Sequence, residues 1–311
     1  MKKPFLISFC ILLLAFISIY FIIPQKIKTT HIVQIDATDV NVAKFLVNKK
    51  PWDKWWPGKH SASNPDLFTY NGIEFLLQKN TNSGIDVIID PKGINLTGNI
   101  SYLASSDEVC KVTWVTQTMS ELNPISRVTG YLKIKQETKN IDSILSRFKQ
   151  FMQQDSNIYG ITVAAEKIKF PIVIATTTNT TSYPSVKIIY AAIADLKTQV
   201  SGQNAMELDS PMVNIHQVDN GYQVMVAIPI NKLITPSKGS VINKLPKGGN
   251  LLTTQVKGGF HTVEIAFNQL KKFQENKGLK SPAMPYGSLL TNRLREPDSA
   301  KWVTKIYYPS Y

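Results

Sequence analysis

Hydrophobic residues run without a charge from Phe5 to Ile23, directly after the basic start Met-Lys-Lys. At a rise of about 1.5 Å per residue, a helix of this length nearly crosses a hydrocarbon core of about 30 Å. Pro24-Gln25-Lys26 follows at once, without the small residues that precede a signal-peptide cleavage site. The pattern therefore predicts an uncleaved N-terminal transmembrane helix, with residues 1–28 as the anchor.

From residue 29 to about residue 158, short apolar runs alternate with turn residues. A strand-like alternation at the start is followed by apolar residues at helical spacing in the run VNVAKFLVN. Turn signals such as Asn-Gly and Ser-Gly then separate five strand-like runs, at 67–78, 84–90, 94–104, 108–118 and 125–134. Residues 140–152 form an amphipathic pattern with Asn140 as a candidate N-cap. The predicted order is a strand, short helices, an antiparallel meander and a long helix.

The remaining chain, residues 159–311, repeats one pattern twice. A pair of strand-like runs precedes a helical stripe, and a hairpin through Asp219-Asn220-Gly221 follows. After another strand, a second helix has its apolar stripe between Val263 and Phe273, with Gly278 as a candidate C-cap. The sequence thus predicts an α+β fold in which the anchor precedes two domains, 29–158 and 159–311. The second domain consists of two tandem strand-helix-strand halves.

The first domain opens with VQIDATDVNVAKFLVNKKPWDKWWPG. This opening and the element order resemble the SRPBCC, or START-like, superfamily, to which the polyketide cyclase-like proteins belong. The resemblance covers residues 30–158. It implies a helix-grip fold, in which a curved sheet wraps the last helix and leaves an apolar cavity between them. Trp114, Tyr131 and Phe148 are the side chains expected at that cavity.

The second domain contains the stretches DSPMV, GYQVMVAIPI, LPKGGNLLTTQVKGGF and EPDSAKWVTKIYYP. These resemble the GyrI-like effector-binding domain of bacterial transcription activators, over residues 161–309. The resemblance implies a ligand cleft between the two halves that takes amphipathic or cationic molecules; some relatives are hydrolases. Five aromatic residues in the matching stretches are the predicted ligand-binding set: Tyr183, Tyr222, Phe260, Tyr286 and Trp302.

One departure from the GyrI-like pattern concerns charge. Such domains commonly carry a glutamate before the Glu-Pro-Asp run, where it can bind a ligand cation or act as a base. The matching position here is Gly287, within PYGSLLTNRLREPD. Glu207, Asp209 and Glu264 are the acids that could replace it. The missing glutamate counts against both cation binding through that position and a hydrolase that depends on it.

Composition and motif content argue against nucleic-acid, metal and cofactor binding. The net charge of +13 comes from scattered lysines rather than from one basic arm, so no nucleic-acid partner is predicted. Two cysteines and four separated histidines offer no metal site, and no nucleotide- or cofactor-binding motif occurs. We therefore expect no cofactor.

The leading hypothesis is a single-pass protein of a bacterial inner membrane with its soluble domains outside the cytoplasm. It would bind small hydrophobic or amphipathic molecules, for sensing or sequestration, without turning them over. A small-molecule hydrolase and a protein that docks a partner at the membrane remain the alternatives. The run PWDKWWPG is interpreted mainly as a fold marker, with Trp56 free to face a ligand, the second domain or the bilayer.

Overall fold

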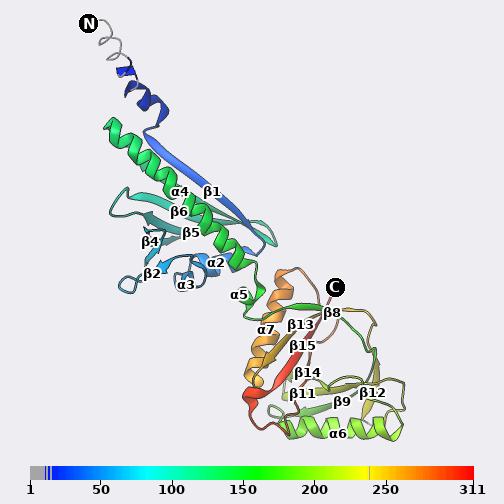
Figure 1. Cartoon of the computed structure of the whole chain (residues 1–311). Helices are drawn as coiled ribbons and strands as arrows, with labels where there is room; N and C mark the ends of the chain where they lie inside the picture. Colours follow the sequence, from blue (N-terminus) through cyan, green and yellow to red (C-terminus); the bar gives the residue numbers. More distant parts are fainter. Residues whose placement is uncertain (1–10, 12, 15, 238) are drawn as a thin grey trace, which may run out of the picture. The chain divides into compact units, whose positions relative to one another are not determined.

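The computed structural model describes residues 11, 13–14, 16–237 and 239–311. The chain divides into two compact units, one ending at Gln154 and the other beginning at Asp155. Each unit contains one large antiparallel sheet with its own helices, so the fold is mixed α+β (Figure 1).

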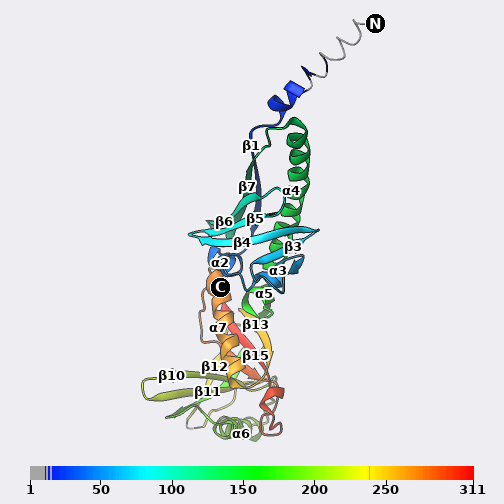
Figure 2. The same ribbon diagram turned by 90° about the vertical axis from the view of Figure 1, so that its left-hand side faces the viewer.

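The first unit is built on a seven-stranded antiparallel sheet in the order β1-β7-β6-β5-β4-β3-β2. Its strands are β1 (Lys26–Ile35), β2 (Lys59–His60), β3 (Leu67–Tyr70), β4 (Ile73–Thr81), β5 (Gly84–Ile89), β6 (Leu96–Ser106) and β7 (Val109–Met119). Its helices are α2 (Asp39–Leu46), α3 (Trp52–Trp55) and α4 (Pro124–Met152). Both views show α4 running beside β1 (Figures 1 and 2).

Helix α4 is much longer than the sequence pattern predicts. The run 125–134, interpreted above as the last strand, is its first part. The helix begins because the Asn123 side chain accepts hydrogen bonds from the backbone N–H groups of Ile125 and Ser126, and Pro124 occupies the first turn. Asn140 is therefore an interior residue, not an N-cap; its side chain accepts a hydrogen bond from the Asn71 amide.

The tryptophans of PWDKWWPG all belong to the core of the first unit. Trp52, Trp55 and Trp56 are 0%, 2% and 7% exposed, and their indole N–H groups donate to the backbone carbonyls of Leu46, Phe45 and Thr69. Buried indoles need such a partner. The interpretation of Trp56 as a side chain free to face a ligand or bilayer is thus wrong.

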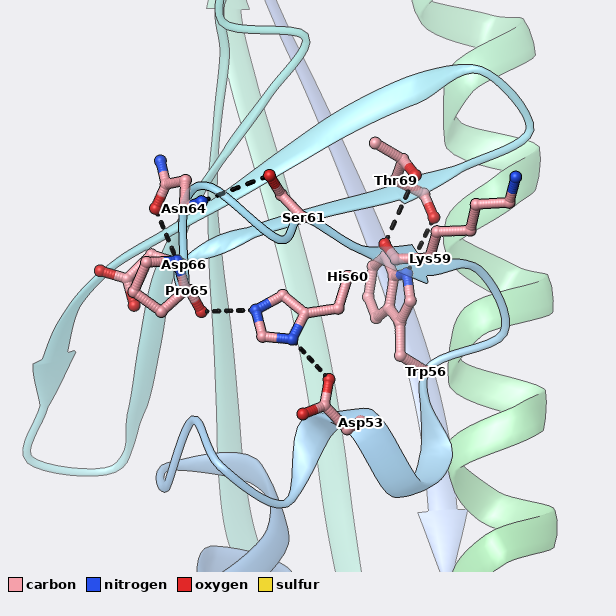
Figure 3. A network of polar contacts seen from close by, with 9 residues as sticks. All are labelled: Asp53, Trp56, Lys59, His60, Ser61, Asn64, Pro65, Asp66 and Thr69. Carbon is pink, nitrogen blue, oxygen red and sulfur yellow. Dashed lines mark hydrogen bonds and ion pairs between the residues drawn. The ribbon is translucent and has the colours of Figure 1, made fainter.

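Figure 3 shows how the chain after Trp56 is held against strand β3. The Trp56 indole donates to Thr69, while the two ring nitrogens of His60 lie 2.8 Å from an Asp53 oxygen and 3.0 Å from the Pro65 carbonyl. The His60 ring also stacks on Phe68, with centroids 4.4 Å apart. These contacts hold the segment in the fold, with Trp56 and Phe68 buried.

The predicted N-terminal transmembrane helix needs correction. Much of the stretch Phe5–Ile23 lies outside the described residues. Within the part of the chain that is described, no helix is long and apolar enough to cross a membrane. The end of the stretch packs on protein instead: Ile23 is 5% exposed in a cluster with Ile27 and Ile134, and its carbonyl accepts hydrogen bonds from Arg127. The predicted location in a bacterial inner membrane stays a prediction.

The second unit is built on an eight-stranded antiparallel sheet in the order β12-β9-β11-β10-β14-β15-β13-β8. The strands are β8 (Ala164–Lys167), β9 (Ile172–Thr180), β10 (Met212–Val218), β11 (Gly221–Pro229), β12 (Ser240–Lys244), β13 (Asn250–Lys257), β14 (Tyr286–Leu289) and β15 (Val303–Ser310). Helical segments are α5 (Asp155–Tyr159), α6 (Val186–Gly202), α7 (Phe260–Asn276) and the 3₁₀ turn η1 (Ser299–Lys301).

Two similar halves make up the six central strands of this sheet, with β12 and β8 at its edges. The first runs β9-α6-β10-β11 and the second β13-α7-β14-β15. In each half the last strand lies between the other two, and the halves join where β10 pairs with β14. The sheet order therefore reads the same from either side of this junction, as expected for two copies of one unit related by a pseudo-twofold axis.

Both long helices cover the same face of the sheet. On β14, Leu289 belongs to the buried cluster formed by α6. A Cβ atom at Gly287, two residues earlier on the same face, would lie 3.9 Å from Phe267 of α7. Successive strand residues point to opposite faces, so Tyr286 and Ser288 face away from both helices. The sheet therefore has one face covered by α6 and α7 and one face without a helix, and β14 contributes side chains to both.

Candidate functional site

A cavity of about 660 Å³ lies against the helix-free face of the second unit. Its floor is a row of small and flexible side chains on three neighbouring strands: Ala175 on β9 pairs with Ala227 on β11, which pairs with Met212 on β10. The two alanines place only methyl groups at the sheet surface and so leave room above it. Met225, next along β11 on this face, also lines the cavity. The site therefore arises from small residues at paired positions.

The wall opposite the floor comes from two connecting segments. One is the run Pro282-Ala283-Met284-Pro285, held to the sheet by the Asn214 amide, which donates to the Pro285 carbonyl at 2.7 Å. The other contains Leu245 and Pro246. Prolines have no backbone N–H, so this wall presents mainly apolar surface. Among the residues that the structure describes, no Asp, Glu, Lys or Arg side chain lines the cavity.

Tyr286 stands at the end of the cavity, where a smaller polar pocket of about 300 Å³ begins. Its ring stacks on Tyr307, with centroids 5.0 Å apart and planes 16° from parallel. Burial raises the pKa of the Tyr286 hydroxyl, which therefore stays protonated and can donate a hydrogen bond. It is the predicted ligand-binding residue that lines this cavity.

The polar pocket contains an ion pair that the sequence pattern does not reveal. Lys305 on β15 and Glu166 on β8 lie 2.6 Å apart, and Thr253 donates to the same Glu166 oxygen at 3.2 Å. The hydrogen bond from Lys305 lowers the pKa of Glu166. The two residues are 139 positions apart, so only the sheet register brings them together. The charges of Glu166 and Lys305 neutralise each other, and Lys167, Lys169 and Asp209 also line this pocket.

The other predicted residues lie on or beside the helix-covered face. Tyr183, just before α6, packs against Phe260 at the start of α7 (centroids 3.7 Å apart) and against Tyr222 on β11 (5.4 Å). Trp302 comes directly before β15, and its indole N–H donates to the Glu296 carbonyl. The structure therefore brings Tyr183, Tyr222 and Phe260 together but separates them from Tyr286 across the sheet.

None of the three candidate acids takes the place of the family glutamate at Gly287. Gly287 points to the helix-covered face, where a Cβ atom would lie 3.1 Å from the Thr304 methyl group. Glu207 forms an ion pair with Lys197 at 2.6 Å, and Glu264 lies 3.7 Å from its neighbour His261. Asp209 lines the polar pocket on the other face.

In the first unit, two of the three expected cavity residues, Trp114 and Phe148, belong to the buried aromatic core, and Tyr131 does not. Trp114 and Phe148 are fully buried, and Phe148 packs against Trp55 with centroids 4.5 Å apart. Tyr131 packs elsewhere, in the cluster of Ile23 and Ile27. A groove of about 690 Å³ in this unit is lined by polar side chains of the sheet, Asp86 and Asn99 among them.

Comparisons with known proteins give only structural likenesses. No protein-family model and no curated protein matches the chain. The C-terminal domain of EcmrR is similar at 16% identity with a TM-score of 0.42, over 49% of this chain and 98% of that one. A hydrolase from Listeria innocua has 12% identity and a TM-score of 0.36, over 52% and 98%. The di-domain aromatase/cyclase BexL has 12% and 0.34, over 92% and 85%. All three TM-scores are below 0.5, so they identify no family for this chain.

Proposed function

We propose that the second unit is a GyrI-like effector-binding domain that holds a small, uncharged and predominantly apolar molecule without turning it over. The observation that carries this proposal is the cavity of about 660 Å³ on the helix-free face. Ligand pockets of drug-sized molecules have volumes of roughly 300–1,000 Å³ and are mostly apolar with a few orienting polar groups. The tandem halves and the motif stretches quoted above support the assignment to this kind of domain.

The chemistry of the lining determines the class of ligand. A charged molecule would lose its hydration shell on entering a cavity in which no side chain of the described lining carries a charge to compensate it. An apolar molecule loses nothing comparable and gains contact with Met212, Met225 and Leu245. Tyr286 and the amide of Asn214 supply the few polar groups that could orient it. We therefore propose a neutral ligand rather than the cation implied by the family resemblance.

We further propose that the first unit is an SRPBCC-like helix-grip domain. Its support is the order of elements: a strand, two short helices, an antiparallel meander and the long helix α4. The aromatic cluster of Trp52, Trp55 and Trp56 fills its interior. The proposed ligand site therefore belongs to the second unit.

Thermal-shift measurements on the whole chain test the ligand proposal. We expect neutral amphiphiles to raise the melting temperature more than cationic or anionic ones of the same skeleton, because a ligand that binds only the folded state stabilises it. Ala227→Phe, which fills the floor of the cavity, should abolish that shift. Ala194→Leu, on the exposed side of α6, is the matched control and should leave it unchanged. If no neutral compound shifts the melting temperature, or if Ala227→Phe retains the shift, the proposal fails.

A further inference from the structure

A second, separate feature of the second unit is the half-buried Arg293, in the segment between β14 and β15. Its guanidinium lies over the Trp302 ring, 4.8 Å from the ring centroid. One terminal nitrogen, Nη2, donates to the hydroxyl of Thr304 at 2.7 Å, and Thr304 is only 1% exposed. The Arg293 backbone N–H donates to the Tyr190 hydroxyl of α6 at 2.8 Å. Both the side chain and the backbone of Arg293 are therefore held in place.

The charge of Arg293 has no counterion in the part of the chain that the structure describes, where no carboxylate lies within 4.0 Å of the guanidinium. Its Nε–H is buried and has no hydrogen-bond acceptor. Burial lowers the pKa of the guanidinium, but an arginine side chain stays charged in proteins. Buried charges are normally paired, because an unpaired one gives up its hydration without compensation. Arg293 thus carries a positive charge that no carboxylate of the described residues neutralises.

The surroundings of Arg293 suit a flat, negatively charged molecule. Tyr183 and Phe260 form an aromatic pair, and Phe260 is 43% exposed, so the pair is open to solvent. Burial raises the pKa of the Tyr183 hydroxyl, the positive charge of Arg293 partly offsets this, and the negative charge of Glu264 adds to it. Trp302 lies close to the start of α7, because its backbone carbonyl accepts a hydrogen bond from the N–H of Gly258, two residues before Phe260.

Helix α7 adds a further positive contribution at this place. It begins at Phe260, and no side chain caps its first turn. The free N–H groups at the start of a helix carry a partial positive charge and favour anions. The nearest carboxylate on this helix, Glu264, is exposed and lies 3.7 Å from His261. Two sources of positive potential therefore meet beside the aromatic pair.

We propose that the helix-covered face of the second unit carries a binding site for a small aromatic anion, with Arg293 as its counterion. A carboxylate accepts two parallel N–H bonds from one guanidinium, a geometry that gives both strength and orientation. The ring of such a ligand packs against Tyr183 and Phe260. The site uses none of the residues that line the apolar cavity on the other face. The two proposals can therefore be tested independently of each other.

Benzoate, benzyl alcohol and benzylammonium test this proposal on the whole chain, because they share one ring and differ in charge. Binding is followed by ¹H–¹⁵N NMR, through the indole N–H of Trp302, which Trp302→Phe assigns. We expect benzoate to shift this signal with a Kd roughly ten-fold or more below that of benzyl alcohol, and benzylammonium to leave it unshifted. This comparison needs no altered side chain at the site, so it does not depend on the folding of a variant.

Variants then locate the charge that matters. Arg293→Gln should weaken benzoate binding roughly ten-fold or more, and Arg293→Lys should restore only part of it, because lysine cannot form the bidentate pair. Arg295→Gln removes the same charge from an exposed side chain nearby and should change nothing. Equal binding of benzoate and benzylammonium, or equal loss in the two glutamine variants, would overturn the proposal. Failure of the neutral-ligand experiment leaves it untouched, since Ala227→Phe alters the opposite face.

Discussion

At the scale of single residues, the buried carboxyl group of Glu137 on α4 makes the stability of the folded protein depend on pH. It is 2% exposed, and neither of its oxygens has a hydrogen-bond partner; the Lys133 ammonium lies 3.8 Å away. Burial raises the pKa of Glu137, the negative charge of Asp90 adds to this, and Lys133 offsets part of it. The folded state therefore keeps the proton on Glu137 to a higher pH than the unfolded chain does.

This pKa shift has a definite sign for stability. Below the ordinary glutamate pKa both states are protonated, so ionisation of this group does not change the free energy of unfolding. As pH rises from there through the raised pKa of the folded state, the unfolded state is favoured and stability is lost. We expect Glu137→Gln to raise the free energy of unfolding by on the order of 1 kcal/mol at about pH 7.5 and by clearly less at about pH 4.

Urea unfolding of the wild type and the variant at the two pH values measures this difference. Glu121→Gln, which removes an exposed carboxylate, should give no such pH-dependent gain. A Glu137→Gln protein that is equally stabilised at both pH values, or destabilised at about pH 7.5, would show that the carboxyl group is solvated or paired in the folded protein.

At the scale of elements, helix α4 depends on its first turn. The Asn123 side chain satisfies the N–H groups of Ile125 and Ser126, and such N-caps contribute about 1 kcal/mol. Asn123→Ala should therefore lower the stability of the first unit by about that amount.

Gly130→Ala should act in the opposite direction by up to about 1 kcal/mol, because Gly130 is inside the helix and a Cβ atom there meets no atom within 4 Å. Circular dichroism during urea unfolding measures both. A loss of stability in both variants would contradict this account of α4.

The same helix shows what sequence patterns can and cannot predict. Asn123-Pro124 is a helix-start signal visible in the sequence, but the β-branched and aromatic residues of 125–134 favoured a strand. Burial of Ile134 against Ile23 and Ile27 is a tertiary effect, and it overrides that local preference. The tandem halves could be predicted because their alternation is local.

The candidate site was harder to predict than the elements. Which face each aromatic residue occupies depends on the register of the strands, and a shift by one residue reverses it. Tyr286 and Tyr222 are therefore on opposite faces although one motif resemblance suggested both. The pair Glu166–Lys305 and the unpaired Arg293 each depend on contacts between distant segments, which no local spacing reveals.

At the scale of the whole molecule, the division into two units places short helix α5 with the second unit. Ile158 and Tyr159 are buried there: the Tyr159 ring packs against Phe273 at 5.3 Å, and its hydroxyl accepts a hydrogen bond from Asn276 at 3.0 Å. The second unit has its own sheet and its own buried core around α6. We therefore expect residues 155–311 to fold alone with one cooperative unfolding transition.

A chain that starts at residue 160 removes the aromatic ring and the hydrogen bond of Tyr159 from α7. We expect it to be less stable than 155–311 by about 2–4 kcal/mol, from the exposed surface of Phe273 and the lost contacts. Tyr159→Phe in the longer fragment removes only the hydroxyl and should cost about 1 kcal/mol, which separates the ring's contribution from the hydrogen bond. Urea unfolding of the three proteins gives the comparison. If the shorter fragment were as stable as the longer one, α5 would be a linker and the second unit would begin after it, near the boundary that the sequence predicts.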